Sequence, residues 1–150
     1  MRQKKYLSVI IPLVLILATV CFLLFFKIII VHGESMSPNL KNGQIVLLKR
    51  NVEYNDLHIG DLVVFKSKEY GTCIKRIAAL SGDSISQNDN ELYINGALKF
   101  QYSTDVVAEY QINDNEIYVL GDNFYGSTDS RDFGPIDYSD VVGKIVIPSN

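Results

Sequence analysis

The chain has 150 residues, a length that favours one folded domain, and a formal net charge of −3 at pH 7. Its 14 basic and 17 acidic residues are mixed along the sequence, so there is no basic footprint of the kind that binds nucleic acid. The two cysteines, Cys21 and Cys73, lie in different surroundings, and no Cys/His cluster has the spacing of a metal site. We therefore expect no disulfide, no metal ion, no cofactor and no nucleic-acid partner.

The N-terminal segment predicts a membrane anchor. Arg2, Lys4 and Lys5 precede an uncharged stretch at residues 6–26, and roughly 20 apolar residues are enough to span a bilayer as a helix. Basic residues before the span place the N-terminus in the cytoplasm. We expect a cytoplasmic N-terminus at residues 1–5, a single transmembrane anchor at residues 6–27, and an extracytoplasmic domain at residues 28–150, so that the lipid bilayer is one partner.

The alternative for this segment is a cleavable signal peptide. Such a peptide has an apolar core of about 7–15 residues followed by a cleavage site with small residues. Here the longer apolar run is followed by KIIIVH at residues 27–32, which favours a retained anchor.

The rest of the chain predicts an all-β fold, a small antiparallel domain built as a sandwich or a partly open barrel. Short runs rich in Val, Ile, Tyr and Phe alternate with turn residues, and the NG pair at residues 95–96 is typical of a hairpin. A sustained helical period is absent after residue 31, apart from a possible turn at residues 137–140. The expected strands are residues 28–32, 45–49, 61–67, 73–80, 84–86, 91–94, 97–100, 116–120 and 141–147.

A serine stands directly after the first expected strand. Gly33 allows close backbone approach and Pro38 fixes a turn, so Ser35 between them would have an exposed hydroxyl surrounded by backbone N–H groups. That arrangement suits acyl transfer. A plain turn between the membrane and the first strand is the other interpretation.

A lysine in a later strand has an unusual setting. Strand alternation places Cys73, Lys75, Ile77 and Ala79 on one face. A lysine against apolar surface has a lowered pKa, because desolvation disfavours its charged form, and a neutral lysine is a general base for a serine. The alternative is an edge-strand lysine that extends into water.

The loop at residues 121–131 is dense in small polar side chains, which bind loop backbone. Asp129 and Arg131 have the spacing of a local ion pair. A solvated loop remains an alternative, and a calcium loop is opposed by the failure of the EF-hand spacing. Neither His32 nor His58 lies in the context of a Ser-His-Asp triad and there is no G-x-S-x-G elbow, so a serine protease made from this chain needs lysine as its base.

Together these segments resemble the bacterial type I signal peptidases. That family carries, in order, S-M-x-P, G-D-x-V-x-F, K-R-x-x-G-x-P-G-D and G-D-N-x-x-x-S-x-D-S-R. This chain reads SMSP at residues 35–38, GDLVVF at 60–65, KRIAALSGD at 75–83 and GDNFYGSTDSR at 121–131. The four segments cover nearly the whole chain, in the same order and on the same side of the anchor.

The resemblance implies a membrane-bound serine endopeptidase that removes signal peptides from exported preproteins at Ala-x-Ala-like sites. Ser35 resembles the nucleophile and Lys75 the general base. Ser127 would orient the lysine amine, and Asp129 and Arg131 would hold the loop. The Ser35 N–H would form part of the oxyanion hole.

The resemblance also describes the substrate pocket. Met36 would help to line a shallow pocket for a small residue before the cut. Some members place a serine hydroxyl two residues before the nucleophile; the glycine at this position, Gly33, resembles the Gram-positive branch instead. Ala79 and Ser81 replace the usual Gly and Pro, and Asn39 stands where Thr is common. These departures leave two alternatives open: the same chemistry on a narrow client such as a pilin, and an assembly factor without general peptidase activity.

Overall fold

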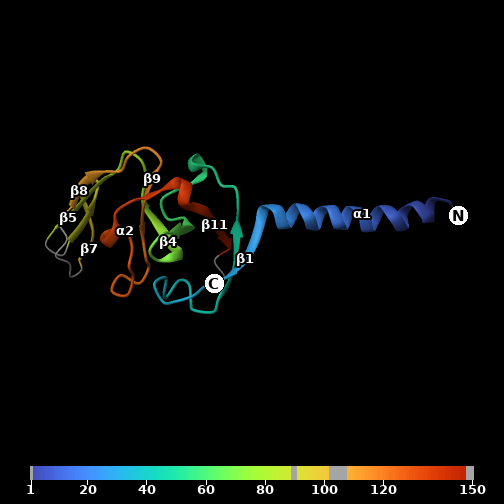
Figure 1. Cartoon of the computed structure of the whole chain (residues 1–150), viewed down its shortest axis with the longest axis horizontal. Coiled ribbons are helices and arrows are strands. Elements are labelled where there is room, and N and C mark those ends of the chain that lie inside the picture. The colour runs from blue at the N-terminus through green and yellow to red at the C-terminus, as the bar shows by residue number, and fades with distance from the viewer. Residues whose placement is uncertain (1, 89–90, 102–107, 148–150) are drawn as a thin grey trace.

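The computed structural model describes residues 2–88, 91–101 and 108–147. One long helix, α1 (Arg2–Phe25), projects from a body of short strands (Figure 1). The chain passes from α1 into the first strand, β1 (Phe26–Ile30), without a loop between them. The backbone N–H of Arg50 donates to the Phe25 carbonyl at 2.7 Å, so the end of the helix is bonded to the strand body.

The strand body contains two antiparallel sheets within the described residues. The larger has the strand order β1-β2-β11-β3-β4-β9-β10 and the smaller the order β7-β6-β5-β8. The predicted antiparallel β domain is thereby confirmed. The remaining strands are β2 (Ile45–Lys49), β3 (Leu62–Ser67), β4 (Gly71–Ala79), β5 (Ser84–Asn88), β6 (Glu91–Ile94), β7 (Ala97–Gln101), β8 (Ala108–Gln111), β9 (Glu116–Leu120), β10 (Ile136–Asp137) and β11 (Val141–Ile147).

Strand β3 lies at the centre of the core. The run from Leu62 to Phe65 is at most 6% exposed at each residue, as expected for a strand covered on both faces. Leu62 and Val64 pack in one apolar cluster, and Val63 and Phe65 pack in another. Strand β4 pairs with β3 from Gly71 to Arg76, which places the middle of β4 beside the buried run of β3.

A third apolar cluster joins the two sheets. Ile85 and Leu92 from the smaller sheet pack with Ala79 and Tyr118 from the larger one, and all four are fully buried. The smaller sheet is therefore attached through a continuous core.

Helix α1 coincides with most of the predicted anchor. Every described side chain from Ile10 to Phe25 is exposed. Among the described residues, however, no helix meets the combined requirement of length and apolar character for a membrane crossing. The anchor at residues 6–27 is therefore unconfirmed and stays a prediction. The outer limits of the predicted segments, residue 1 and residues 148–150, lie outside the described residues.

The elements differ from the expected ones in a few places. Strand β1 begins two residues earlier than predicted, since one apolar run continues from the helix into the strand with no turn residue between them. Strand β8 and the short strand β10 were not predicted, nor was the one-turn helix α2 (Ser130–Phe133). The 3-10 turns are η1 (Tyr54–Asp56), which was not predicted, and η2 (Tyr138–Asp140), which lies where a turn was expected.

Candidate active site

The segment that carries Ser35 is a turn held against the core. Gly33 has φ +87°, a left-handed conformation that glycine adopts without strain, and it lets the chain turn sharply at the end of β1. Met36 is 2% exposed and Leu40 is fully buried, and the Leu40 N–H donates to the Met36 carbonyl at 2.8 Å. Met36 and Leu40, which follow Ser35 in the sequence, are buried, whereas Ser35 itself is half-buried at the surface of the turn.

Lys75 lies on β4 with its side chain turned inward. It is 4% exposed, and Ile77 and Ala79 on the same face are also buried, which agrees with the predicted alternation. The described pairing of β4 with β9 begins at Arg76, so the backbone beside Lys75 has no β9 partner. The Lys75 Nζ donates to the Ser127 Oγ at 2.9 Å.

Burial lowers the pKa of Lys75. Desolvation by the surrounding protein is the largest cause, and the nearby Arg131 charge acts in the same direction. Asp129, Cys73 and Asp132 act in the opposite direction and raise the pKa. The depression means that desolvation outweighs these acidic neighbours, so the neutral amine is reached at lower pH than for a lysine in water.

The loop that follows β9 brings Ser127 to Lys75. A Cβ atom at Gly121 would lie 2.1 Å from the Ser127 Oγ and 2.6 Å from the Ser35 carbonyl oxygen. Contacts under 3 Å are not possible for a real side chain, so glycine is required here. Gly121 is therefore a point of close approach between the serine turn and the 121–131 loop.

Asp129 and Arg131 form a buried ion pair within this loop. The Arg131 Nε and Nη2 each donate to an Asp129 carboxylate oxygen at 2.8 Å. Asp129 is fully buried, caps helix α2, and accepts a further bond of 2.8 Å from the Gly121 N–H. Asp129 is thus bonded to Gly121, which precedes Ser127, and to Arg131, which follows it.

The serine turn and the loop are also joined by bonds that the sequence did not predict. The Asn123 N–H donates to the Ser35 carbonyl at 3.0 Å, and the Asn39 side chain donates to Asp122 at 2.9 Å. Arg76 donates to both carboxylate oxygens of Asp122, at 2.7 and 2.6 Å. Asp122 and Asp129, two of the carboxylates that a calcium loop in this segment would use, are each paired with an arginine, Arg76 and Arg131 respectively.

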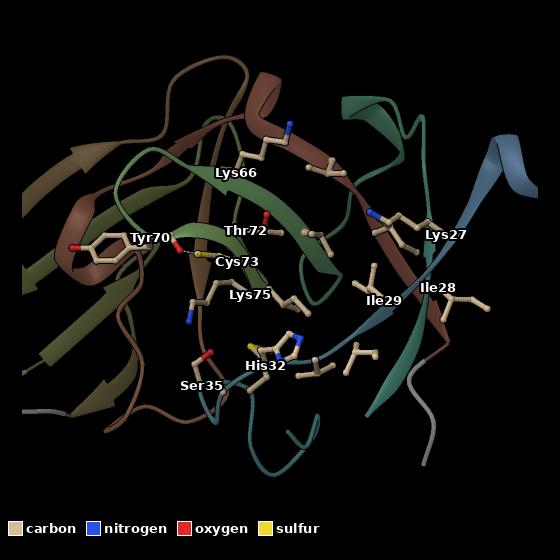
Figure 2. A pocket seen from close by; sticks show the side chains of 18 residues that line it. Lys27, Ile28, Ile29, His32, Ser35, Lys66, Tyr70, Thr72, Cys73 and Lys75 are labelled. Atoms are coloured by element: carbon tan, nitrogen blue, oxygen red, sulfur yellow. Dashed lines mark hydrogen bonds between the residues drawn. The ribbon is translucent and has the colours of Figure 1, made fainter. Parts of the chain in front are cut away.

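Ser35 and Lys75 line one cleft of about 690 Å³. Figure 2 shows the Lys75 amine and the Ser35 hydroxyl pointing toward one another at one end of this cleft. Apolar side chains of β1, β4 and the serine turn form much of the remaining wall, among them Ile29, Met36 and Ile74. The structure thus brings Gly33, Ser35, Met36 and Lys75 to one cleft, with Ser127 bonded to the lysine and Asp129 and Arg131 behind it.

Neither histidine has a described hydrogen bond to Ser35. His32 lines the cleft and is exposed, and His58 is exposed outside the cleft lining, with its Nδ1 3.8 Å from Asp61. Across the part of the chain that the structure describes, no three or more His, Cys, Asp and Glu side chains are grouped to hold a metal ion.

Comparison with known proteins finds a family match along almost the whole chain. A family model described as "Signal peptidase, peptidase S26" matches residues 3–149. Signal peptidase I U of Bacillus subtilis is 29% identical over 95% of this chain and 87% of its own length, and signal peptidase I V of the same organism is 32% identical over 77% and 80%. A crystal structure of a signal peptidase I from Enterococcus faecalis aligns with a TM-score of 0.46 at 24% identity, over 63% of this chain and 98% of that one. The chain therefore belongs to the signal peptidase family S26, and is a serine endopeptidase that removes signal peptides from exported preproteins.

Proposed function

We propose that the chain is a signal peptidase I in which Ser35 is the nucleophile and Lys75 the general base. The observation that carries this proposal is the buried Lys75 amine, which donates to Ser127 at 2.9 Å and lines the same cleft as Ser35. An assembly factor without activity would have no need for this combination. The proposal therefore favours a working peptidase over that alternative.

The chemistry follows from the state of Lys75. A neutral amine that donates one N–H to Ser127 keeps its lone pair for the Ser35 hydroxyl. As the Ser35 Oγ attacks the carbonyl before the cleavage site, Lys75 takes its proton. The resulting ammonium then gives the proton to the nitrogen of the leaving mature chain as the C–N bond breaks. In the second half, Lys75 takes a proton from water, which attacks the ester, and returns it to Ser35.

Other residues act around this pair. Developing negative charge on the carbonyl oxygen needs preorganised donors, and we assign the Ser35 N–H to that role. Ser127 orients the Lys75 amine. Asp129 and Arg131 fix the backbone on both sides of Ser127 through their buried ion pair.

The wall of the cleft accounts for the choice of cleavage site. Met36 is 2% exposed beside Ser35 and limits the depth available to the residue before the cut. Gly33 adds no side chain to the rim. A shallow apolar pocket admits Ala and excludes larger side chains, so we assign Ala-x-Ala-like sites to this enzyme.

We assign helix α1 to a membrane anchor with the catalytic domain outside the cell membrane. The uncharged run at residues 6–26 and the basic residues before it support this assignment. An anchored enzyme meets signal peptides at high effective concentration, since both are confined to one bilayer. Protease treatment of intact protoplasts should digest residues beyond Gly33, and complete protection of the domain would contradict the topology.

The catalytic roles are tested with the full chain in detergent and a preprotein substrate. We expect Ser35→Ala and Lys75→Ala each to lower cleavage by about 10⁴-fold or more, and the double variant to be no worse, because the pair acts as a unit. Lys75→Arg should be equally inactive, since arginine stays charged and cannot take the proton.

The controls for this test are His32→Ala and His58→Ala. His58→Ala should keep the wild-type rate and its rise with pH, and His32→Ala, whose side chain lines the cleft, should keep the rise with pH. Two results would exclude this mechanism. One is more than a few per cent activity in Ser35→Ala. The other is a histidine variant that shifts the acid limb of the pH–rate profile, the rise in rate at low pH, while Lys75→Ala stays active.

A further inference from the structure

A glutamine is buried where the smaller sheet meets the larger one. Gln87 on β5 is 1% exposed, on the same strand face as the fully buried Ile85. Its Nε2 donates to the Arg131 carbonyl at 3.1 Å, and its Oε1 accepts from the Tyr118 hydroxyl at 3.3 Å. An apolar side chain would fill this place without any desolvation penalty. The amide instead supplies a donor to one particular backbone carbonyl.

That carbonyl belongs to the segment that holds the active site together. The Arg131 side chain binds Asp129 twice at 2.8 Å, and its Nη2 also donates to the Ser127 carbonyl at 3.4 Å. Ser127 in turn accepts from Lys75. Gln87 is thus two residue contacts from Ser127 although it lies on a different sheet.

We propose that Gln87 is a positioning residue of the active site. Its amide fixes the backbone at Arg131, and this holds Ser127 where it orients Lys75, so the smaller sheet determines the rate of the chemical step. The inference rests on the proposed roles of Ser35 and Lys75. It assigns a function to a sheet that contributes no side chain to the catalytic cleft among the residues described there.

Loss of this bond has a defined consequence for Lys75. The groups that face its amine are Asp129, Cys73, Arg131 and Asp132, and desolvation outweighs the acidic ones. A loosened 127–131 segment admits water, so desolvation falls and the pKa of Lys75 rises toward the value of a lysine in water. A smaller fraction of the amine is then neutral at any given pH, and the acid limb of the rate profile moves to higher pH.

The test is Gln87→Met, which keeps the length and volume of the side chain and removes both amide bonds. With the full chain in detergent and a preprotein substrate, kcat should fall about 10-fold or more, as expected when a catalytic group is misplaced by a fraction of an ångström. The KM should stay within about twofold, and the acid limb should move to higher pH.

Gln111→Met is the control on the same sheet. Gln111 lies on β8 and is exposed, and its Nε2 donates to the Gly82 carbonyl at 3.1 Å, a bond of the same kind to a carbonyl outside the catalytic loop. Its kcat and acid limb should match those of the wild type. Equal losses in the two glutamine variants, or a change in KM alone, would overturn the proposal.

A direct titration of Lys75 removes the dependence on activity. In ¹³C-lysine-labelled protein, with the resonance assigned through Lys75→Arg, the Lys75 pKa should be higher in Gln87→Met and unchanged in Gln111→Met. A folded Gln87→Met with unchanged Lys75 pKa and kcat sinks the inference. Failure of the proposed mechanism shows elsewhere, as activity in Lys75→Ala.

Tyr118→Phe provides a second variant should Gln87→Met not fold. It removes the hydroxyl that donates to the Gln87 Oε1 and keeps the ring in its fully buried position. A lost neutral hydrogen bond of this kind predicts a kcat about threefold lower, with the acid limb moved in the same direction. A wild-type acid limb in this variant would count against the proposal.

Discussion

Two neighbouring cations on opposite faces of strand β4, Lys75 and Arg76, have pKa values shifted in opposite directions. On one face, Arg76 binds both oxygens of Asp122 and the Gly60 carbonyl, and the bond to Asp122 is the main cause that raises the pKa of Arg76. On the other face, Lys75 is desolvated and bonded to a neutral hydroxyl, and its pKa is lowered. A carboxylate partner thus stabilises the charged form of a cation, whereas burial beside a hydroxyl favours the neutral form of an amine.

Among variants that leave every charged group in place, we expect the largest loss of kcat/KM from a change that displaces the groups around Lys75. A methyl group at Gly121 would collide with the Ser127 Oγ and the Ser35 carbonyl, so Gly121→Ala should displace both serines. We expect kcat/KM to fall about 10²-fold or more. Gly126→Ala is the milder change in the same loop, because its Cβ would meet only the Asn123 side chain, nearest at 2.8 Å, and would disturb the bond of 3.2 Å from that side chain to the Glu34 carbonyl without touching either serine. Its loss of kcat/KM should be smaller than that of Gly121→Ala. A Gly121→Ala enzyme with wild-type kcat/KM would contradict the described approach of the two segments.

A smaller effect is expected from the Arg76 face. Arg76→Gln leaves the Asp122 carboxylate without its bidentate partner, and because Arg76 is partly exposed the loss of stability should be about 1–2 kcal/mol. Asp122 also accepts from Asn39 in the serine turn, so kcat should fall about 10-fold. The acid limb should not move, since the state of Lys75 is set on the other face. Thermal unfolding and pH–rate profiles measure the two parts, and a shifted acid limb would show that the faces are coupled.

The smallest effect sharpens the comparison through stability. The folded pKa of Lys75 lies below its unfolded value of about 10.4, so between the two the unfolded chain binds more protons and wild-type stability rises with pH. Lys75→Met removes the buried amine and should raise the free energy of unfolding by about 1–2 kcal/mol at neutral pH. This advantage should shrink as pH rises toward 10, as followed by thermal unfolding in detergent. If the gain in the free energy of unfolding of Lys75→Met were independent of pH, the pKa of Lys75 would not be lowered in the folded protein.

Local patterns were sufficient to predict most of the described strands and the setting of Lys75. Alternation along residues 73–79 placed the lysine among apolar neighbours, and the structure buries it there. Turn residues marked most strand ends. The start of β1 was misplaced because no turn residue separates α1 from Ile28, and Lys27 alone interrupts the apolar character; β8 was missed because its residues, AEYQ, lack a β-rich pattern.

Long-range partners were beyond the reach of such patterns. The bond from Asn123 to Ser35 joins positions 88 residues apart, and the bond from Gln87 to Arg131 joins positions 44 apart. From sequence alone, a glutamine in a short strand, such as Gln87, would be predicted to be exposed. The family resemblance named the reactive groups, but the residues that hold them in place depend on how the two sheets pack.

The direct passage from α1 into β1 has a mechanical consequence. Phe25 ends the helix and Phe26 begins the strand, which leaves no flexible linker to absorb a change in the helix. Each residue of an α-helix advances about 1.5 Å and turns about 100°. One residue inserted before Phe25 would therefore rotate everything N-terminal to it by nearly a third of a turn relative to the catalytic cleft. The orientation of the cleft relative to the side chains of α1 is thus set by the number of residues in the helix.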